Sequence, residues 1–496
     1  MGVSLNTGRG ARLPVAKFAL DTSGNAAGQV DPAGNLILYP ESTGTKLRRL
    51  ADRERARSVS PNVPMLLPSA WQVSTAYVRG NVVSNGGNWY VCVTPGTSAG
   101  SGGPTSSAVN LISDNTAQWA YLGSPTITAN DPLAPTITTS GSSVPGSLTN
   151  LYDCVNFSSV FRRRGCYTQA FATSYWNLFT LDYKSGVTVP GANVAVEFMT
   201  DAPIFAIAQT NNDPRCNVRI DGRLVALDGP ARAANSPNWS IYDFSAVGGR
   251  RTRRVTVEYC NAWATNTQRF GGVRVGPNDQ VWSPPAAQAK AVFCADSILS
   301  GTSTYGPMLF GSSVATNVGR ALGWDDVWDM SIGGTGYVAT SGGNAYYTFA
   351  QRIPQIVAQN PDIVVFMGST NDFGQSGVTA AVTATLRGLR DAGYAGPIVV
   401  AGVIPVSAEA ATTEAQVAAG VAAFVDPRRS TYWIPVASDP LFPWITGAWN
   451  NTLNTQSTNA TLLISPDTIH PMDYGTEYLS RRLARAIDQQ VLSALY

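Results

Sequence analysis

Strand-like and helix-like patterns alternate through the C-terminal part of the chain, and this alternation limits its fold more than any other feature. Four short apolar runs have the length of buried strands: residues 291–294, 363–367, 397–403 and 432–436. Helical spacing follows at 379–392 and 414–425, and an amphipathic stretch at 474–495 closes the chain. This order predicts a parallel sheet with helices on both faces. We therefore expect residues 286–496 to form a three-layer α/β/α sandwich.

The chain contains one histidine, His470, in the segment Asp467-Thr468-Ile469-His470-Pro471. An aspartate three residues before a histidine lets one turn of chain direct both side chains toward one point. The carboxylate can then orient the imidazole as a catalytic base. A lone histidine is more often a packed or surface residue than a catalyst. The interpretation therefore depends on partners elsewhere in the chain.

Ser297 is the candidate nucleophile. It follows the apolar run 291–294 and precedes Gly301, at a predicted strand-to-helix turn. A serine there has an exposed hydroxyl and lies beside backbone N–H groups that are free to bind an oxyanion. Taken alone, the Asp-Ser pair is typical of an ordinary turn. We expect Asp296 to cap that turn rather than take part in the chemistry.

Two further segments supply groups suited to binding negative charge. Gly334 lies in the glycine-rich stretch 329–336, where the backbone can approach a bound group closely. Asn371 follows the run 363–367, and ligands of α/β sheets bind at the carboxyl ends of strands. An amide donor at such a place contributes ~3 kcal/mol to transition-state binding.

These four segments, in this order, resemble the four blocks of the SGNH (GDSL-type) hydrolase superfamily, over roughly residues 286–496. The chain departs from the family pattern at two positions. Ala295 stands where the family usually has glycine before Asp-Ser, and Ser369 stands where it usually has the glycine of Gly-x-Asn-Asp. Both residues are small, so the departures bear on loop geometry more than on chemistry.

The resemblance implies a mechanism and its residues. Ser297 would attack an ester carbonyl, His470 would move the proton, and Asp467 would orient the imidazole. The oxyanion would lie between the Ser297 N–H, the Gly334 N–H and the Asn371 side-chain amide. No metal or other cofactor is expected, since a zinc hydrolase normally needs several histidine or carboxylate ligands.

Composition limits the partners. Hydrophobic residues make up 44% of the chain, charged residues only 13%, and the net charge is +2, which argues against a nucleic-acid partner. No apolar run approaches the ~20 residues of a membrane span, so no membrane partner is expected. The N-terminus lacks the apolar stretch of a signal peptide. The six cysteines leave open one or two disulfides or packed free thiols, and Cys294 is expected to be buried.

The N-terminal half is predicted to be modular. Residues 1–65 include a highly charged run at 47–57, which is either a solvated linker helix or part of an anchoring or oligomerising segment. Residues 66–123 alternate apolar residues between Gly/Asn turns, as in a small antiparallel sheet. This unit resembles small chitin-binding-type carbohydrate modules. Its tryptophans are either candidate glycan contacts or simply the core of a small domain: Trp71, Trp89 and Trp119.

Residues 124–149 are rich in Ser, Thr, Pro and Gly and are predicted to be a linker. Strand patterns then fill residues 150–283, with a hairpin signal at Asp221-Gly222, and predict a β-sandwich. This part resembles the jelly-roll domain that precedes the hydrolase domain in some carbohydrate esterases. Its arginine clusters at 162–164 and 250–254 are interpreted as solvated faces or as contacts to an acidic polysaccharide.

The prediction is a serine esterase that removes O-acetyl or other short acyl groups from a polysaccharide. Modular β-rich N-terminal parts resemble bacteriophage tail fibres and tailspikes. That resemblance implies a virion-tail or extracellular location, a homotrimer and contacts with other virion tail proteins. Two alternatives stay open. One is a receptor-binding or adhesive fibre with a weakly active or vestigial hydrolase. The other is a lipase or thioesterase, which would require an apolar acyl groove.

Overall fold

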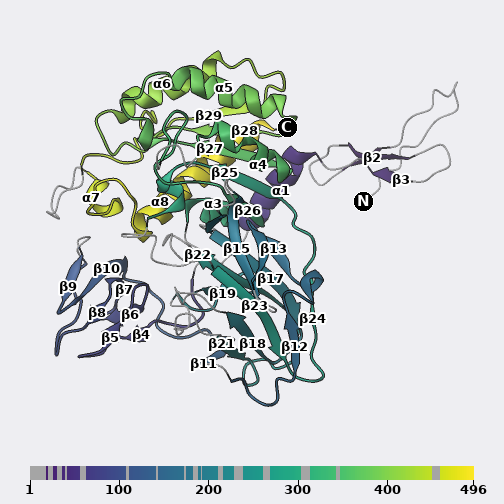
Figure 1. Cartoon of the computed structure of the whole chain (residues 1–496), viewed down its shortest axis with the longest axis vertical. Coiled ribbons are helices and arrows are strands. Elements are labelled where there is room, and N and C mark those ends of the chain that lie inside the picture. The colour runs from purple at the N-terminus through teal and green to yellow at the C-terminus, as the bar shows by residue number, and fades with distance from the viewer. Residues whose placement is uncertain are drawn as a thin grey trace, which may run out of the picture.

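The computed structural model describes residues 18–20, 26–30, 36–38, 42–55, 63–107, 111–140, 143–171, 175–182, 188–190, 193–209, 216–227, 238–260, 268–302, 313–341, 347–448 and 458–495. In chain order these residues form a small N-terminal sheet, a helix, a small β module, a β-sandwich and an α/β domain (Figure 1). The β-rich N-terminal part and the C-terminal α/β/α sandwich confirm the predicted fold class.

A parallel sheet of five strands forms the centre of the C-terminal domain. In spatial order the strands are β26 (Asp326–Asp329), β25 (Lys290–Cys294), β27 (Ile363–Met367), β28 (Ile398–Ala401) and β29 (Thr431–Ile434). The chain leaves β25 for β26 on one side and then crosses to β27 on the other. The strand order therefore reverses around β25, and such a switch point is where open α/β sheets bind their ligands.

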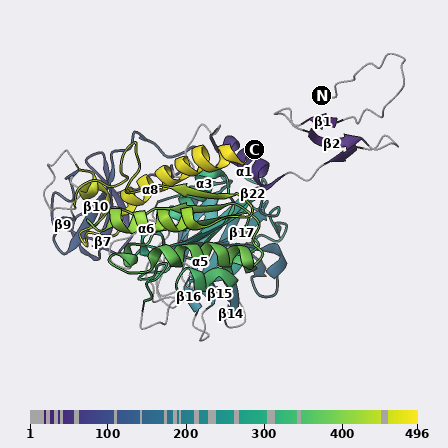
Figure 2. The same cartoon turned by 90° about the horizontal axis from the view of Figure 1, so that it is seen from above.

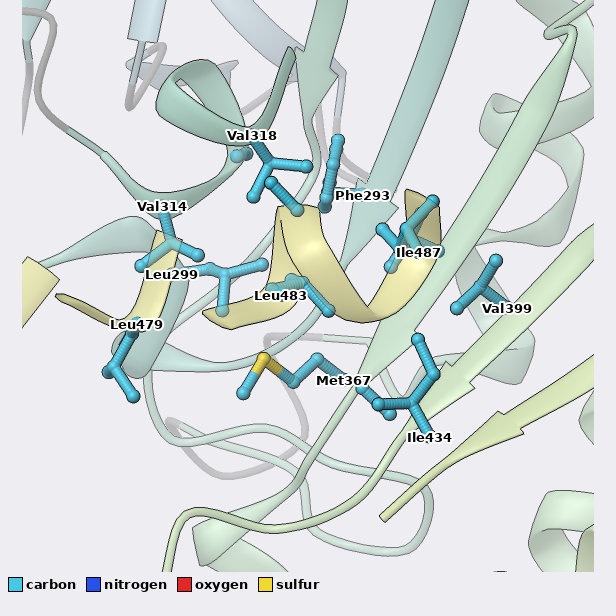
Figure 3. Close-up of a cluster of buried hydrophobic side chains, with 14 of the residues drawn as sticks. Phe293, Leu299, Val314, Val318, Met367, Val399, Ile434, Leu479, Leu483 and Ile487 are labelled. Atoms are coloured by element: carbon cyan, nitrogen blue, oxygen red, sulfur yellow. The ribbon is translucent and has the colours of Figure 1, made fainter. Parts of the chain in front are cut away.

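Alternating side chains of each strand enter opposite helix layers. Phe293 of β25 packs in one buried cluster and its neighbour Val292 in another, because successive strand residues point to opposite faces. Helix α8 fills the first cluster with Leu479 and Leu483 (Figure 3). The first layer contains α1 (Thr43–Arg55), α3 (Val314–Leu322), α7 (Ala460–Leu463) and α8 (Asp473–Ala486). The second contains α4 (Ile353–Ala358), α5 (Val378–Asp391) and α6 (Ala410–Ala423).

Helix α1 packs on the hydrolase-like domain although it lies far from it in sequence. Leu47, Leu50 and Ala51 are buried in the same cluster as α3 and α8. Lys46 Nζ lies 2.5 Å from the carboxylate of Asp362. Residues 47–55 therefore form a helix that packs its apolar face on this domain, while the charged side chains of Asp52, Arg53 and Arg55 stay exposed. The anchoring or oligomerising role of residues 1–65 stays a prediction, and residues 1–17 of that segment lie outside the described chain.

A three-stranded antiparallel sheet precedes α1 and stands apart from the rest of the chain in both views (Figures 1 and 2). Its strands are β1 (Phe18–Leu20), β2 (Ala26–Val30) and β3 (Leu36–Leu38).

Two antiparallel sheets form the predicted β-sandwich around one buried cluster that is rich in aromatic rings. One sheet contains β11 (Thr136–Ser140), β12 (Asn150–Asp153), β14 (Tyr167–Phe171), β15 (Tyr175–Asp182), β16 (Thr188–Pro190), β18 (Ile204–Gln209), β21 (Asn238–Asp243) and β23 (Gln268–Val275). The other contains β13 (Arg162–Arg164), β17 (Asn193–Thr200), β19 (Asn217–Ile220), β20 (Arg223–Leu224), β22 (Arg253–Cys260) and β24 (Val281–Trp282). Asp221 and Gly222 both have positive φ in the β19–β20 hairpin, as the turn signal predicted.

Strand β11 corrects the predicted linker at 124–149. Residues 136–140 pair along their whole length with β21 and so belong to the sandwich. The Ser/Thr-rich composition that suggested a linker also suits an edge strand, since threonine favours extended backbone.

Three arginines of the two clusters also differ from the prediction. Arg162, Arg164 and Arg254 surround the buried carboxylate of Glu197, with N–O distances of 2.5, 2.9 and 3.0 Å. Arg162 and Arg254 also reach Asp325, which lies directly before β26 of the α/β domain. The interpretation of these three residues as solvated faces or polysaccharide contacts is therefore wrong. They link the sandwich to the hydrolase-like domain.

A five-stranded sheet and a two-stranded sheet make up the small β module. Its strands are β4 (Ser69–Ala70), β5 (Ala76–Tyr77), β6 (Val82–Asn85), β7 (Asn88–Thr94), β8 (Gly96–Thr97), β9 (Ile112–Asp114) and β10 (Ala117–Gly123). Tyr90 and Cys92 of β7 point into the module's own core, while Val91 and Val93 point to the other face.

Within the ranges given above, the structure contains no helix that is both long and apolar enough to cross a membrane. Five of the cysteines are buried thiols: Cys92, Cys154, Cys166, Cys216 and Cys294. Of the two alternatives for the cysteines, packed thiols hold for these five.

Candidate active site

Ser297 lies at the strand-to-helix turn predicted for it. It lies three residues after the end of β25 and opens the short helix α2 (Ser297–Ser300). Asp296 has extended backbone, and its Oδ1 accepts the Ile298 N–H at 2.9 Å. Asp296 therefore caps the turn, as expected. Gly301 ends the helix with φ 79°, a conformation that glycine adopts without strain.

His470 joins Ser297 to Asp467. Its Nε2 lies 2.7 Å from Ser297 Oγ, and its Nδ1 lies 2.7 Å from Asp467 Oδ2. Ser297 lies at the start of α2, whereas His470 and Asp467 lie in the loop before α8, and Ser297 and His470 are 173 residues apart in sequence. The fold therefore brings together the three residues that were singled out from the sequence.

The loop that carries His470 is closed by its own backbone. The Ser465 N–H donates to the His470 carbonyl at 2.8 Å, and Ile464 forms a β-bridge with Pro471. The second carboxylate oxygen of Asp467, Oδ1, accepts hydrogen bonds from the backbone N–H of His470 at 2.9 Å and from the Ser465 hydroxyl at 2.7 Å. These bonds fix the carboxylate before it meets the imidazole.

The charge of Asp467 defines the imidazole tautomer. Burial alone would raise the pKa of Asp467, but its hydrogen bonds from the His470 ring and backbone, Ser465 and Ile469 lower the pKa below its ordinary value. The carboxylate is therefore ionised at neutral pH and can only accept. Nδ1 of His470 must carry the proton, and Nε2 is left to accept from the Ser297 hydroxyl.

The glycine-rich loop lies beside Ser297. A Cβ placed on Gly333 would lie 3.5 Å from the Ser297 Cβ, and Gly334 has φ 76°. Asp372 holds this loop in place. Its buried carboxylate accepts the N–H groups of Tyr337, Val338 and Ala339 at 2.8, 3.1 and 2.8 Å. From the sequence, Asp372 was only the last residue of the segment compared with Gly-x-Asn-Asp. The structure shows that its three hydrogen bonds anchor the glycine-rich loop.

Asn371 lies on the same rim as Gly334, in the turn Thr370–Asp372 after β27. Its Nδ2 lies 3.0 Å from the Thr335 carbonyl oxygen, 3.3 Å from Ser369 Oγ and 3.5 Å from Asp296 Oδ2. An amide NH₂ has two hydrogens. The shortest contact uses one of them, and a bound oxyanion would compete with the two longer contacts for the other. Gly334, Asn371 and Ser297 all line one pocket.

Ser369, one of the two departures from the family pattern, makes contacts that glycine would lack. Its hydroxyl lies 2.9 Å from Asp296 Oδ2 and 2.8 Å from the Thr335 carbonyl, and it accepts the Asn371 N–H at 2.9 Å. Asp296 Oδ2 also accepts the Thr370 N–H and hydroxyl, both at 2.9 Å. The turn that carries Ser297 is thereby tied to the turn that carries Asn371.

Arg352 is a buried residue that sequence reasoning missed. Its guanidinium donates to the carbonyls of Ala295 and Met330 at 2.9 and 3.0 Å and to the hydroxyl of Thr335. It therefore fixes the segment before Ser297 and both ends of the glycine-rich loop. Its only sequence signal is an arginine that precedes the helical run of α4, which does not reveal burial.

An open pocket of about 700 Å³ lies over these groups. Apolar side chains and hydroxyl groups share its wall: Phe373, Val406 and Ile469 together with Thr302, Thr370, Ser407 and Thr468. No group of three or more metal-ligating side chains is found in the part of the chain that the structure describes.

The three tryptophans of the small module have different environments. Trp119 is fully buried, and its Nε1 donates to Asp114, so it is wrong as a glycan contact. Trp71 is partly buried against the module's core and donates to the same carboxylate at 2.8 Å. Trp89 is partly exposed on the face of β7 opposite that core. Trp89 therefore stays a candidate contact.

One comparison with known proteins, that with protein families, covers this site. Residues 296–478 match the model of the GDSL-like Lipase/Acylhydrolase family. No curated protein matches the chain. Three solved structures illustrate what it is similar to, and all have low identity.

The first is a salicylyl-acyltransferase from a tetracycline biosynthetic pathway, at 13% identity over 71% of this chain and 99% of that one, with a TM-score of 0.48. The second is a family two carbohydrate esterase from Clostridium thermocellum in complex with cellohexaose, at 16% identity over 60% and 93%, with a TM-score of 0.45. The third is an acetyl xylan esterase from the rumen bacterium Butyrivibrio proteoclasticus, at 15% identity over 71% and 98%, with a TM-score of 0.44. The family match spans every predicted residue of the triad and the oxyanion hole, and the C-terminal region is a GDSL-like hydrolase domain.

Proposed function

We propose that the protein is a serine esterase that removes O-acetyl or other short acyl groups from a polysaccharide. The observation that carries the proposal is the continuous Ser297–His470–Asp467 hydrogen-bonded chain at the rim of the pocket. The family match of residues 296–478 supports ester hydrolysis as the reaction class.

In the proposed reaction, Nε2 of His470 accepts the Ser297 hydroxyl proton as Oγ attacks the ester carbonyl carbon. The carbonyl oxygen becomes an oxyanion, which the Ser297 N–H, the Gly334 N–H and the Asn371 side-chain amide stabilise. His470 then gives its proton to the leaving alcohol, and an acyl-serine remains. A water molecule then attacks the carbonyl carbon of the acyl-serine while His470 accepts a proton from that water. His470 returns the proton to Ser297 Oγ as the carboxylic acid leaves.

Asp467 acts without exchanging a proton. Its lowered pKa keeps it ionised, so it stabilises the imidazolium that forms during each transfer. Its backbone hydrogen bonds hold it at one position through both half-reactions.

The pocket supports a short acyl group on a polar carrier. Three apolar side chains offer room for a small acyl chain, and the surrounding hydroxyl groups suit a sugar. The polysaccharide, the homotrimer and the phage tail setting with other virion tail proteins extend this proposal. They rest on the resemblance of the N-terminal modules to such proteins.

The test compares acetate release by wild type and by Ser297→Ala, His470→Ala and Asn371→Ala, from p-nitrophenyl acetate and from an acetylated bacterial polysaccharide. We expect kcat to fall by about 10⁴-fold or more for the first two variants and by about 10²-fold for the third. Ser493→Ala, an exposed serine near the C-terminus that does not line the pocket, is the matched control and should stay within about twofold.

Two outcomes would favour other functions. A wild-type protein that binds cells or polysaccharide, releases no acetate and is indifferent to Ser297→Ala would favour an adhesive fibre. Rates that rise from acetyl to octanoyl esters would favour a lipase or thioesterase.

A further inference from the structure

The small β module packs against the loop that carries His470. Val82, Val91, Val93 and Ala120 of the module form one buried cluster with Met472. Met472 lies two residues after His470 and is only 6% exposed. Figure 1 shows the module's strands β7 and β10 next to the region of α7 and α8.

Met472 is the one residue of the hydrolase domain among the buried members of that cluster, within the described chain. Its side chain therefore packs on another module rather than on its own domain's core. Its backbone belongs to the catalytic loop: its N–H donates to the Leu463 carbonyl at 3.2 Å, and its carbonyl accepts the Thr476 N–H at 2.7 Å. Met472 thereby joins the end of the His470 loop to the start of α8.

We propose that the small β module positions His470 through Met472, so that the module is a structural part of the catalytic site. The physical reason is the way the two ends of the loop are held. The Ile464–Pro471 bridge and the Met472 N–H bond to Leu463 join the two ends to each other, and burial of Met472 under the valines of the module supports them from outside. Loss of that apolar contact leaves the ends of the loop held by backbone bonds alone, two residues from the imidazole.

The consequence for catalysis rests on the proposed function, but the consequence for geometry does not. A histidine displaced by about 1 Å loses up to 10²-fold in rate because proton transfer requires a short, aligned hydrogen bond. The hydrogen bond from Nδ1 to Asp467 should weaken in parallel, whether or not the protein cleaves an ester.

Neighbouring valines of β6 provide a matched pair of variants. Val82 and Val83 are each 2% exposed, but Val82 belongs to the Met472 cluster and Val83 to the module's own core. Val82→Ala and Val83→Ala remove the same atoms from equally buried places. Only Val82→Ala removes them from the contact with the catalytic loop.

The test follows the Nδ1–H signal of His470 by NMR in the full-length chain labelled with ¹⁵N-histidine. His470 is the only histidine, so the signal needs no further assignment. We expect solvent exchange of this proton to be about tenfold faster in Val82→Ala and Met472→Ala, through local opening of the loop. Val83→Ala and the conservative Met472→Leu should exchange like wild type, with all variants confirmed as folded by thermal unfolding.

Esterase kinetics on the same variants separate this inference from the proposed function. We expect kcat to fall about tenfold in Val82→Ala and Met472→Ala with little change in KM. Exchange that responds as expected in a protein without esterase activity would retain the positioning role and reject the proposed reaction. Unchanged exchange in both variants, or an equal response in Val83→Ala, would overturn the positioning role itself.

Discussion

Two regions of the chain bury carboxylates, and the groups that bind these carboxylates differ between the two regions. Around the candidate active site, Asp372 accepts backbone N–H groups, and Asp296 accepts backbone N–H and hydroxyl groups. Between the sandwich and the hydrolase domain, Glu197 is surrounded by arginines. A backbone N–H has a fixed direction, so the first arrangement sets the course of a loop. A guanidinium on a long side chain adapts to its partner, so the second holds two surfaces together without defining a loop.

Glu414 extends the first arrangement to the far strands of the sheet. Its buried carboxylate accepts the N–H groups of Val403, Ala437 and Ser438 at 2.9, 2.8 and 2.7 Å, after strands β28 and β29. The carboxyl ends of neighbouring strands are thus fixed by acidic side chains. This is the edge where the substrate pocket lies, and it requires loops of constant shape.

The largest expected effect is on the arginine side of the comparison. Glu197→Gln leaves three guanidinium groups around a neutral side chain. We expect the unfolding free energy to fall by about 4 kcal/mol, because the positive charges stay buried without a negative charge to compensate them. Urea unfolding measures it. The exposed pair Arg481–Glu477 gives the control, since Arg481→Gln should cost under about 0.5 kcal/mol. Equal losses in both variants would remove the distinction between the two regions.

Acid should weaken the same interface. Burial alone would raise the pKa of Glu197, but Arg164, Arg254 and Arg162 lower it to about 2, from 4.5 in its unperturbed form. A folded-state pKa below the unfolded value stabilises the protein above pH 4.5, and this stabilisation of about 3 kcal/mol is lost as the pH falls toward 2. The pKa of Asp372 is raised by burial, so its contribution has the opposite sign. Asp372 is present in both wild type and Glu197→Gln, so its contribution drops out of the difference between their unfolding free energies. That difference should shrink as the pH falls from 5 to 2. A difference that is constant with pH would contradict the pairing.

On the backbone side, the expected effect is on rate rather than stability. Asp372→Asn places an amide NH₂ against the N–H groups of the glycine-rich loop, so the loop that carries Gly334 must shift. We expect kcat to fall about 10²-fold, as for loss of one oxyanion donor. Asp362→Asn is the control. Asp362 also accepts a backbone N–H, that of Lys290, but at the amino end of β25, away from the pocket. It should change stability and leave kcat within about twofold. Equal losses of kcat would show that the site does not depend on this loop in particular.

The sequence predicted the site better than the interfaces, and the reason is the range of the interactions. Asp467 and His470 lie within one turn of chain, and Ser297 and Asn371 each follow a strand whose apolar run is visible locally. The partners of Glu197 come from β13 and β22, so they depend on strand register that no local pattern contains. The face that a tryptophan occupies is equally non-local: Trp119 and Trp89 lie in similar strand patterns, yet one is core and the other is partly exposed.

The smallest expected effect concerns the departure from the family pattern at Ser369. Its hydroxyl contacts Asp296 and accepts the Asn371 N–H, so Ser369→Gly removes a link between the nucleophile turn and the oxyanion turn. We expect kcat to fall about tenfold, which corresponds to one hydrogen bond of about 1.4 kcal/mol to a charged group. Ser369→Ala keeps the β-carbon and lacks the hydroxyl, so it should lose the same factor if the hydroxyl matters. Full activity in Ser369→Gly would show instead that Asp296 and Thr370 suffice to hold the two turns, and that glycine and serine are interchangeable here. An effect in Ser369→Gly without one in Ser369→Ala would assign the role to backbone freedom, since glycine alone adds conformations that the turn must exclude.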